Sequence, residues 1–95
     1  MLSIIFDNRF KKEYKKCLKR GCKASDFEKV LSLLANEKSL PEKYKDHPLT
    51  NSKDYEDVRE LHIYPDWLLI YRIENDNVKI LRCMRTGTHP DLFCL

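Results

Sequence analysis

The stretch Trp67-Leu68-Leu69-Ile70-Tyr71-Arg72-Ile73 decides the fold of this chain, because it is the most hydrophobic run in the sequence. Its aromatic and branched residues are typical of a β-strand. Nearly every position is apolar, as in a strand that is covered on both faces. We therefore expect this run to be the central strand of a sheet.

Turn residues separate this run from a strand on either side. Tyr64-Pro65-Asp66 precedes it, and Asn75-Asp76-Asn77, whose residue types tolerate a positive φ, follows it as a hairpin turn. The spacing predicts one strand over residues 55–63 and a last strand over residues 78–84, with Arg85 at its end. Strand 55–63 alternates, which puts one set of side chains on each face: Arg59, Leu61 and Ile63 against Val58, Glu60 and His62.

The N-terminal half has helical periodicity. Residues 2–6 predict a first strand, after which Asp7 or Asn8 is suited to cap a helix that ends at Gly21. Ser25 and Glu28 have the spacing of a capping box, so we expect a second helix to begin there. Residues 38–54 contain few periodic apolar residues and predict a long loop that carries His47.

These elements predict an α+β fold of the order β-α-α-β-β-β, in which a helical hairpin packs on a small antiparallel sheet. We expect a single domain over residues 1–95. The face of the sheet away from the hairpin is expected to be partly open and to carry Glu60 and His62. Leu92 and Phe93, in the short tail, are expected to pack back on the sheet.

Composition excludes several classes of protein. Hydrophobic residues make up 42% and charged residues 35%, which fits a folded chain rather than a disordered one. No apolar run approaches the roughly 20 residues of a membrane span, and residues 1–6 lack the features of a signal peptide. The four cysteines form no C-x-x-C motif, so we expect reduced thiols, no zinc site and a cytoplasmic protein.

The net charge of +3 is unevenly distributed. Residues 9–23 contain eight basic residues and one acid, Glu13, whereas the chain from Asp46 onward has a net charge of −3. Such a helix is suited to nucleic acid or to an acidic protein, although a solvated helix face is about as plausible. The candidate contact residues are basic and exposed on the predicted helix: Lys11, Lys12, Lys15, Lys16, Lys19 and Arg20.

The three histidines of the chain are the candidate catalytic groups. RNA cleavage by transfer to the 2′-hydroxyl needs a base, an acid and a cation for the phosphate, and no metal, because RNA supplies its own nucleophile. Imidazole exchanges protons near neutral pH, and arginine binds phosphate through two parallel donors. The candidates are His47, His62 and His89, with Asp66 and Arg85. Taken singly, each is more often a surface histidine, a turn residue or an ion-pair partner.

Three motifs together resemble the YafQ family, toxins of the RelE/ParE superfamily from bacterial toxin–antitoxin modules. They are Tyr44-Lys45-Asp46-His47-Pro48-Leu49, Leu61-His62-Ile63-Tyr64-Pro65-Asp66-Trp67-Leu68-Leu69-Ile70-Tyr71 and Arg85-Thr86-Gly87-Thr88-His89-Pro90-Asp91-Leu92-Phe93. Their order and spacing agree with the family, and the resemblance extends from the helical hairpin to Phe93. The segment Asn51-Ser52-Lys53-Asp54 lacks a glycine often found there.

The resemblance implies a bacterial, ribosome-dependent endoribonuclease that cleaves mRNA in the ribosomal A site without a cofactor. It also implies inhibition by a small ribbon-helix-helix antitoxin of the DinJ type, with operator DNA bound only through that antitoxin. His89 would be the principal general acid, and His47, His62 and Asp66 would act as base or relay proton transfer. Arg85 would hold the phosphate, and Phe93 would orient the base or support His89.

Two other functions remain open at this stage. A ParE-like relative would act by binding a protein such as gyrase, without RNA cleavage, because one fold supports both activities. An inactive member would only assemble with an antitoxin. The set of three histidines with Asp66 and Arg85 favours the ribonuclease, since a protein that only binds has no need of it.

Overall fold

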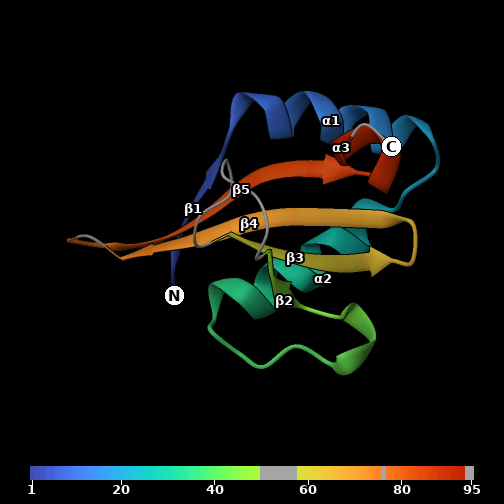
Figure 1. Cartoon of the computed structure of the whole chain (residues 1–95). Coiled ribbons are helices and arrows are strands. Elements are labelled where there is room, and N and C mark those ends of the chain that lie inside the picture. Colours follow the sequence, from blue (N-terminus) through green and yellow to red (C-terminus); the bar gives the residue numbers. More distant parts are fainter. Residues whose placement is uncertain (50–57, 76, 94–95) are drawn as a thin grey trace.

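The structure is a computed structural model that describes residues 1–49, 58–75 and 77–93, without the side chain of Phe93. The helices and strands follow one another along the chain (Figure 1): β1 (Ser3–Phe6), α1 (Asn8–Lys19), α2 (Ala24–Ala35), the short 3-10 helix η1 (Glu42–Tyr44), β2 (His47–Pro48), β3 (Arg59–Tyr64), β4 (Trp67–Asn75), β5 (Lys79–Gly87) and α3 (His89–Phe93). The α+β class is confirmed.

One five-stranded sheet has the strand order β1-β5-β4-β3-β2, so the apolar strand β4 is at its centre as predicted. The sheet is mixed, because β1 pairs with β5 in parallel while the other pairs are antiparallel. The prediction of a purely antiparallel sheet was therefore wrong for β1. Hydrophobic alternation identifies strands, but it does not fix the direction in which distant strands pair.

Helices α1 and α2 cover one face of the sheet. The largest core cluster lies between them and the alternate residues of β3, β4 and β5, including Leu61, Leu69 and Leu81, all fully buried. On α1, Phe10 and Cys17 are on one helical face and buried, which accounts for the periodicity of that segment. This confirms the helical hairpin and the inward face predicted for β3.

The opposite face of the sheet is less open than we predicted. Val58, Leu68, Ile70 and Leu92 form a second buried cluster there, and Leu49 and Met84 pack against it. Leu92 comes from α3, which lies across the end of the sheet beside α1 (Figure 1). Glu60 lies on this face and is only 4% exposed, and the three histidines lie around its carboxylate.

Helix α2 begins two residues earlier than the capping-box pattern predicts, because that pattern makes Ser25 the N-cap. Lys23 is the N-cap residue, and its carbonyl accepts hydrogen bonds from the backbone N–H groups of Asp26 and Phe27. Ser25 is therefore within the first turn, and its assignment as the cap was wrong. Gly21 has a φ of +101°, which confirms it as the left-handed residue after α1.

Two boundaries near the predicted site also differ. Strand β5 continues to Gly87, so Arg85 lies within the strand, paired with Ile70, and not at its end. The predicted loop 38–54 contains η1 and β2, and β2 pairs His47 with Glu60. Residues 50–54 of that loop and Asp76 of the predicted turn lie outside the described residues. Within the described ranges, none of the helices is sufficiently long and apolar to cross a membrane.

Candidate active site

The carboxylate of Glu60 is the centre of the candidate site. Its Oε1 atom lies 3.4 Å from Nε2 of His62, 3.6 Å from Nε2 of His47 and 3.8 Å from Nε2 of His89. The side chain of Glu60 is 5% exposed, whereas those of His47 and His89 are 47% and 44% exposed. The structure thus brings the three predicted histidines together, around an acid that solvent hardly reaches.

Strand pairing places the first two histidines. Glu60 and His62 are two residues apart on β3 and therefore share a face, and β2 places His47 directly opposite Glu60. The rings of His47 and His62 lie 6.3 Å apart between centroids, and those of His62 and His89 lie 5.6 Å apart. The cluster therefore joins β2, β3 and α3.

Backbone carbonyls fix the orientation of two of the rings. Nδ1 of His47 lies 2.6 Å from the carbonyl oxygen of Lys45, and Nδ1 of His62 lies 3.3 Å from that of Pro65. A carbonyl only accepts, so each Nδ1 carries the hydrogen and each Nε2 is left to face Glu60. Lys45 has a φ of +49°, a left-handed conformation rare for residues with a side chain. Each Nε2 is then the atom at which a proton is gained or lost beside the carboxylate.

Asp46 anchors the segment that carries His47. Its carboxylate accepts hydrogen bonds from Arg59 at 3.2 Å on each oxygen and from the hydroxyl of Tyr71 at 2.5 Å. Burial and then this carboxylate raise the pKa of Tyr71 well above its ordinary value, so the hydroxyl remains a donor. The contacts tie the strand β2 to β3 and β4, which fixes His47 although its ring is exposed.

A reciprocal cap positions His89 at the start of α3. The backbone N–H of Thr88 donates to the carboxylate of Asp91 at 3.1 Å, and the N–H of Asp91 donates to Oγ1 of Thr88 at 3.2 Å. Arg20, the C-cap residue of α1, forms an ion pair with Asp91 at 2.7 Å. The pKa of Asp91 is lowered to about 2, because of Arg20 first and then the N–H of Thr88.

Arg85 is buried in the structure and engages an acid. Its Nη2 atom lies 2.6 Å from Oε2 of Glu13, the one acid of α1, and its Nη1 donates to the carbonyl of Leu92 at 3.0 Å. The Arg85 side chain is 9% exposed. Arg85 thereby connects α1, β5 and α3, and the phosphate contact predicted for it stays a prediction.

The two remaining predicted residues are less closely associated with the cluster. Asp66 is exposed in the turn between β3 and β4 and lines a small cavity with Gly87 and Thr88. Among the described residues no hydrogen bond or ion pair joins it to His47 or His62. Phe93 is the last residue of α3, and its side chain lies outside the described part of the structure.

Glu60 is the residue that the sequence-based prediction missed as a site residue. The alternation of residues 55–63 does place Glu60 on the same face as His62, which is the signal that would have included it. The long segment between His47 and Glu60 conceals their pairing, since no turn signal marks β2 as the partner of β3. The sequence alone therefore gave no reason to expect His47 and Glu60 to lie opposite each other.

Glu60, His62 and His89 also have the geometry of a metal-binding set. Their ligand atoms all lie within 4.8 Å of one another. Two ligands of a tetrahedral ion at bond lengths of about 2.1 Å are roughly 3.4 Å apart, which is close to the 3.4 Å and 3.8 Å from Glu60 to His62 and His89. Two imidazoles and one carboxylate suit a divalent transition metal.

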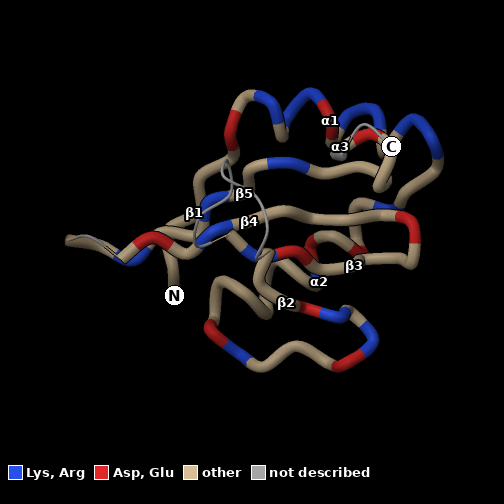
Figure 2. The backbone as a smooth tube through the Cα atoms, viewed as in Figure 1, with Lys and Arg blue, Asp and Glu red and all other residues tan. Residues whose placement is uncertain are grey.

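The basic helix forms a separate surface. Figure 2 shows the basic residues gathered along α1, on the side of the molecule where α1 meets α3. The five lysines at positions 11, 12, 15, 16 and 19 are exposed, whereas Arg20 is already paired with Asp91. Helix α1 places Glu13 toward β5, where it contacts Arg85 and Thr86.

Three comparisons show what the chain is similar to. Residues 2–94 match the family model described as bacterial toxin of type II toxin–antitoxin system, YafQ. The mRNA interferase toxin YafQ of Escherichia coli (strain B / BL21-DE3) is 40% identical over 91 residues, which cover 95% of this chain and 94% of that toxin.

Solved structures agree in fold as well as in sequence. A chain in the crystal structure of the E. coli DinJ–YafQ complex is 38% identical with a TM-score of 0.86, covering 98% of this chain and 99% of that one. A metal-bound toxin from Helicobacter pylori is 40% identical with a TM-score of 0.89, covering 98% of this chain and 100% of that one. This chain therefore belongs to the YafQ family of toxins of bacterial type II toxin–antitoxin systems.

Proposed function

We propose that this chain is an endoribonuclease that cleaves mRNA in the ribosomal A site by acid–base catalysis at its histidine cluster. The observation that carries the proposal is the set of three Nε2 atoms within 4 Å of one Glu60 oxygen. The E. coli relative named as an mRNA interferase, alike over nearly the whole chain, supports this assignment.

The chemistry requires two proton transfers. One imidazole Nε2 takes the proton of the 2′-hydroxyl, whose oxygen attacks the adjacent phosphorus, and a second returns a proton to the departing 5′-oxygen. A 2′,3′-cyclic phosphate and a free 5′-hydroxyl result. His89, exposed at the start of α3, is proposed as the acid, with His47, His62 and Asp66 as base or relay. Arg85 is proposed to hold the phosphate, and Phe93 to orient the base or to support His89.

The ribosome is proposed to supply the alignment that the small cluster lacks. In-line attack requires the 2′-oxygen, phosphorus and 5′-oxygen to be held in a line. His47 and His89 are nearly half exposed, so the site offers little enclosure of its own. A substrate held rigidly in the A site would meet this requirement.

Expression of the wild type and of His89→Ala from a tightly regulated promoter tests the proposal. Mapping of mRNA 5′ ends in the arrested cells should show cuts within translated codons that the His89→Ala variant no longer produces. Growth arrest with intact mRNA would reject the ribonuclease and favour a toxin that acts by binding a protein such as gyrase.

An antitoxin of the DinJ type is the proposed protein partner. The solved complex of E. coli YafQ with DinJ supports a partner of this kind for a chain that is alike over 98% of its length. A ribbon-helix-helix antitoxin would bind operator DNA itself, so that the toxin reaches DNA only through it. The exposed lysines of α1 are a proposed contact for the antitoxin or for ribosomal RNA.

We also propose that a divalent transition metal inhibits the cluster. Glu60, His62 and His89 fit the ion, and the related H. pylori toxin is described as metal-bound. An ion bound there would occupy the Nε2 atoms that the proposed reaction needs for proton transfer. Titration with Zn²⁺ should abolish cleavage of ribosome-bound mRNA, and EDTA should restore it. An increase of the rate with Zn²⁺ would instead make the metal part of the reaction.

A further inference from the structure

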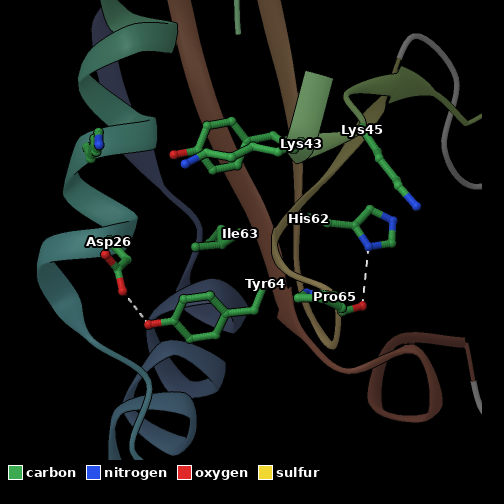
Figure 3. Close-up of a pocket in the computed structure, with 9 residues that line it drawn as sticks. Asp26, Lys43, Lys45, His62, Ile63, Tyr64 and Pro65 are labelled. Atoms are coloured by element: carbon green, nitrogen blue, oxygen red, sulfur yellow. Dashed lines mark hydrogen bonds between the residues drawn. The ribbon is translucent and has the colours of Figure 1, made fainter. Parts of the chain in front are cut away.

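A cavity lies next to the histidine cluster, between α2, η1 and the end of β3 (Figure 3). Its volume is about 460 Å³, and its lining includes Lys29, Lys43, Lys45, His62 and Tyr64. Pockets of about 300–1,000 Å³ accept organic molecules of drug size, a range that includes one nucleotide unit. The cavity is thus a candidate subsite and not only a surface irregularity.

The charges that line the cavity favour an anion. Lys29, Lys43 and Lys45 are exposed, and none of them forms an ion pair with any residue that the structure describes. The acid of the lining, Asp26, accepts a hydrogen bond from the hydroxyl of Tyr64 (Figure 3). The ammonium of Lys43 lies 5.1 Å from the centre of the Tyr44 ring, so one cation is held in place at the rim.

Two residues, His62 and Lys45, connect the cavity to the histidine cluster. His62 lines the cavity while its Nε2 faces Glu60. Lys45 lines the cavity with its side chain, while its carbonyl oxygen lies against Nδ1 of His47. Figure 3 shows the Lys45 side chain extending toward the His62 ring. A strand of nucleic acid in contact with His62 would therefore have the cavity directly beside it.

From this geometry we infer that the cavity binds the sugar–phosphate backbone of single-stranded RNA, one nucleotide away from the bond exposed to the histidine cluster. The ammonium groups of Lys29, Lys43 and Lys45 line the cavity and offer cations to the phosphates of the strand. Tyr64, which also lines the cavity, offers an aromatic ring, and single-strand binding sites combine such rings with cations. The inference rests on the proposed ribonuclease function, because it places the substrate strand of that reaction.

The test uses a short RNA with 2′-O-methyl groups, which the toxin is unable to cleave because the nucleophile is blocked. Its Kd is measured by fluorescence anisotropy at several salt concentrations for wild type and for Lys43→Gln/Lys45→Gln. The matched control is Lys38→Gln/Lys79→Gln, which removes the same charge from two exposed lysines elsewhere. Thermal denaturation verifies that all three proteins are folded.

We expect the Lys43→Gln/Lys45→Gln variant to bind about tenfold more weakly and its salt dependence to fall by about 0.7 for each phosphate that the lysines no longer neutralise. The control pair should bind like the wild type. Equal affinities of the two variants for the RNA would overturn the inference.

Cleavage of ribosome-bound mRNA separates this inference from the proposed function. We expect Lys43→Gln/Lys45→Gln to raise KM with little change in kcat, because the cavity binds the strand but exchanges no proton. If the wild type cleaves mRNA but Lys43→Gln/Lys45→Gln and Lys38→Gln/Lys79→Gln have the same KM, the RNA-binding role of the cavity is rejected and the ribonuclease function is retained. A wild type that leaves mRNA intact would reject the ribonuclease itself.

Discussion

Glu60 is the residue on which the arrangement of the three histidines depends. Replacement by glutamine keeps the size of the side chain and removes the charge that all three Nε2 atoms face. Because the carboxylate lies beside the three atoms at which the proposed proton transfers occur, we expect Glu60→Gln to lower kcat by about 10- to 100-fold. Single-turnover cleavage of ribosome-bound mRNA measures the effect.

The control for this change is Glu74→Gln. Glu74 forms ion pairs with Arg72 on β4 and Arg82 on β5. Desolvation raises the pKa of its carboxyl, but the two arginines lower it by more, so the pKa is lowered overall. Loss of its charge should leave the cleavage rate unchanged. Equal activity of Glu60→Gln and wild type would show that Glu60 only fills space beneath the rings.

Arg85 presents a different question, because from β5 it contacts protein groups on both α1 and α3. Arg85→Lys keeps a cation but removes the two parallel hydrogen bonds to Glu13 and the bond to the carbonyl of Leu92. We expect a decrease of about 1–3 kcal/mol in the free energy of unfolding, since hydrogen bonds of a buried charge are removed. Chemical denaturation measures this decrease.

The kinetics of a second variant, Glu13→Gln, distinguish two roles of Arg85. If Arg85 positions α3 and hence His89, then Glu13→Gln, which leaves the guanidinium in place, should lower kcat as well. If Arg85 contacts only the phosphate, Glu13→Gln should leave kcat unchanged. The second result would support the phosphate contact that the resemblance implies for Arg85.

At the scale of the element, the junction of β5 and α3 determines where His89 lies. Gly87 has a φ of +153°, and a Cβ there would be 3.1 Å from Cβ of Asp91. Gly87→Ala therefore strains the backbone and pushes on the cap of α3. We expect a loss of about 1–3 kcal/mol in stability with reduced cleavage, measured by denaturation and by activity.

Gly21→Ala is the matched control for this position. Gly21 has a φ of +101°, but a Cβ there would meet no atom within 4 Å. Its substitution should reduce stability through backbone strain alone and leave the specific activity of the folded protein unchanged. A Gly87→Ala variant with full activity per folded molecule would show that α3 tolerates displacement.

The elements also show what the sequence was able to predict. The apolar run of β4 identifies the central strand, and the spacing of Phe10 and Cys17 identifies the inner face of α1, because burial imposes these periods. The parallel contact of β1 with β5 and the short strand β2 were not predicted. Both arise from contacts between distant segments that leave no local pattern, as Glu60 opposite His47 also illustrates.

The molecule as a whole separates the histidine cluster from its most basic surface. The cluster lies on β2, β3 and the start of α3, whereas the lysines lie along α1 (Figure 2). Helices α1 and α3 are nonetheless linked by Arg20 with Asp91 and, through β5, by Glu13 with Arg85. A partner that binds α1 would therefore contact a helix that is linked through these ion pairs to α3, which carries His89.

Charge reversal on α1 tests what that surface binds. Lys15→Glu/Lys16→Glu changes two exposed lysines on the helix remote from the histidine cluster, so binding should weaken while folding is retained. We expect weaker binding to the ribosome or to the antitoxin, with a salt dependence that falls by about one unit per phosphate if RNA is the partner. Antitoxin binding that weakens while ribosome binding is unchanged would assign the surface to the acidic protein. Unchanged affinity for both at every salt concentration would mean that the lysines of α1 are a solvated helix face.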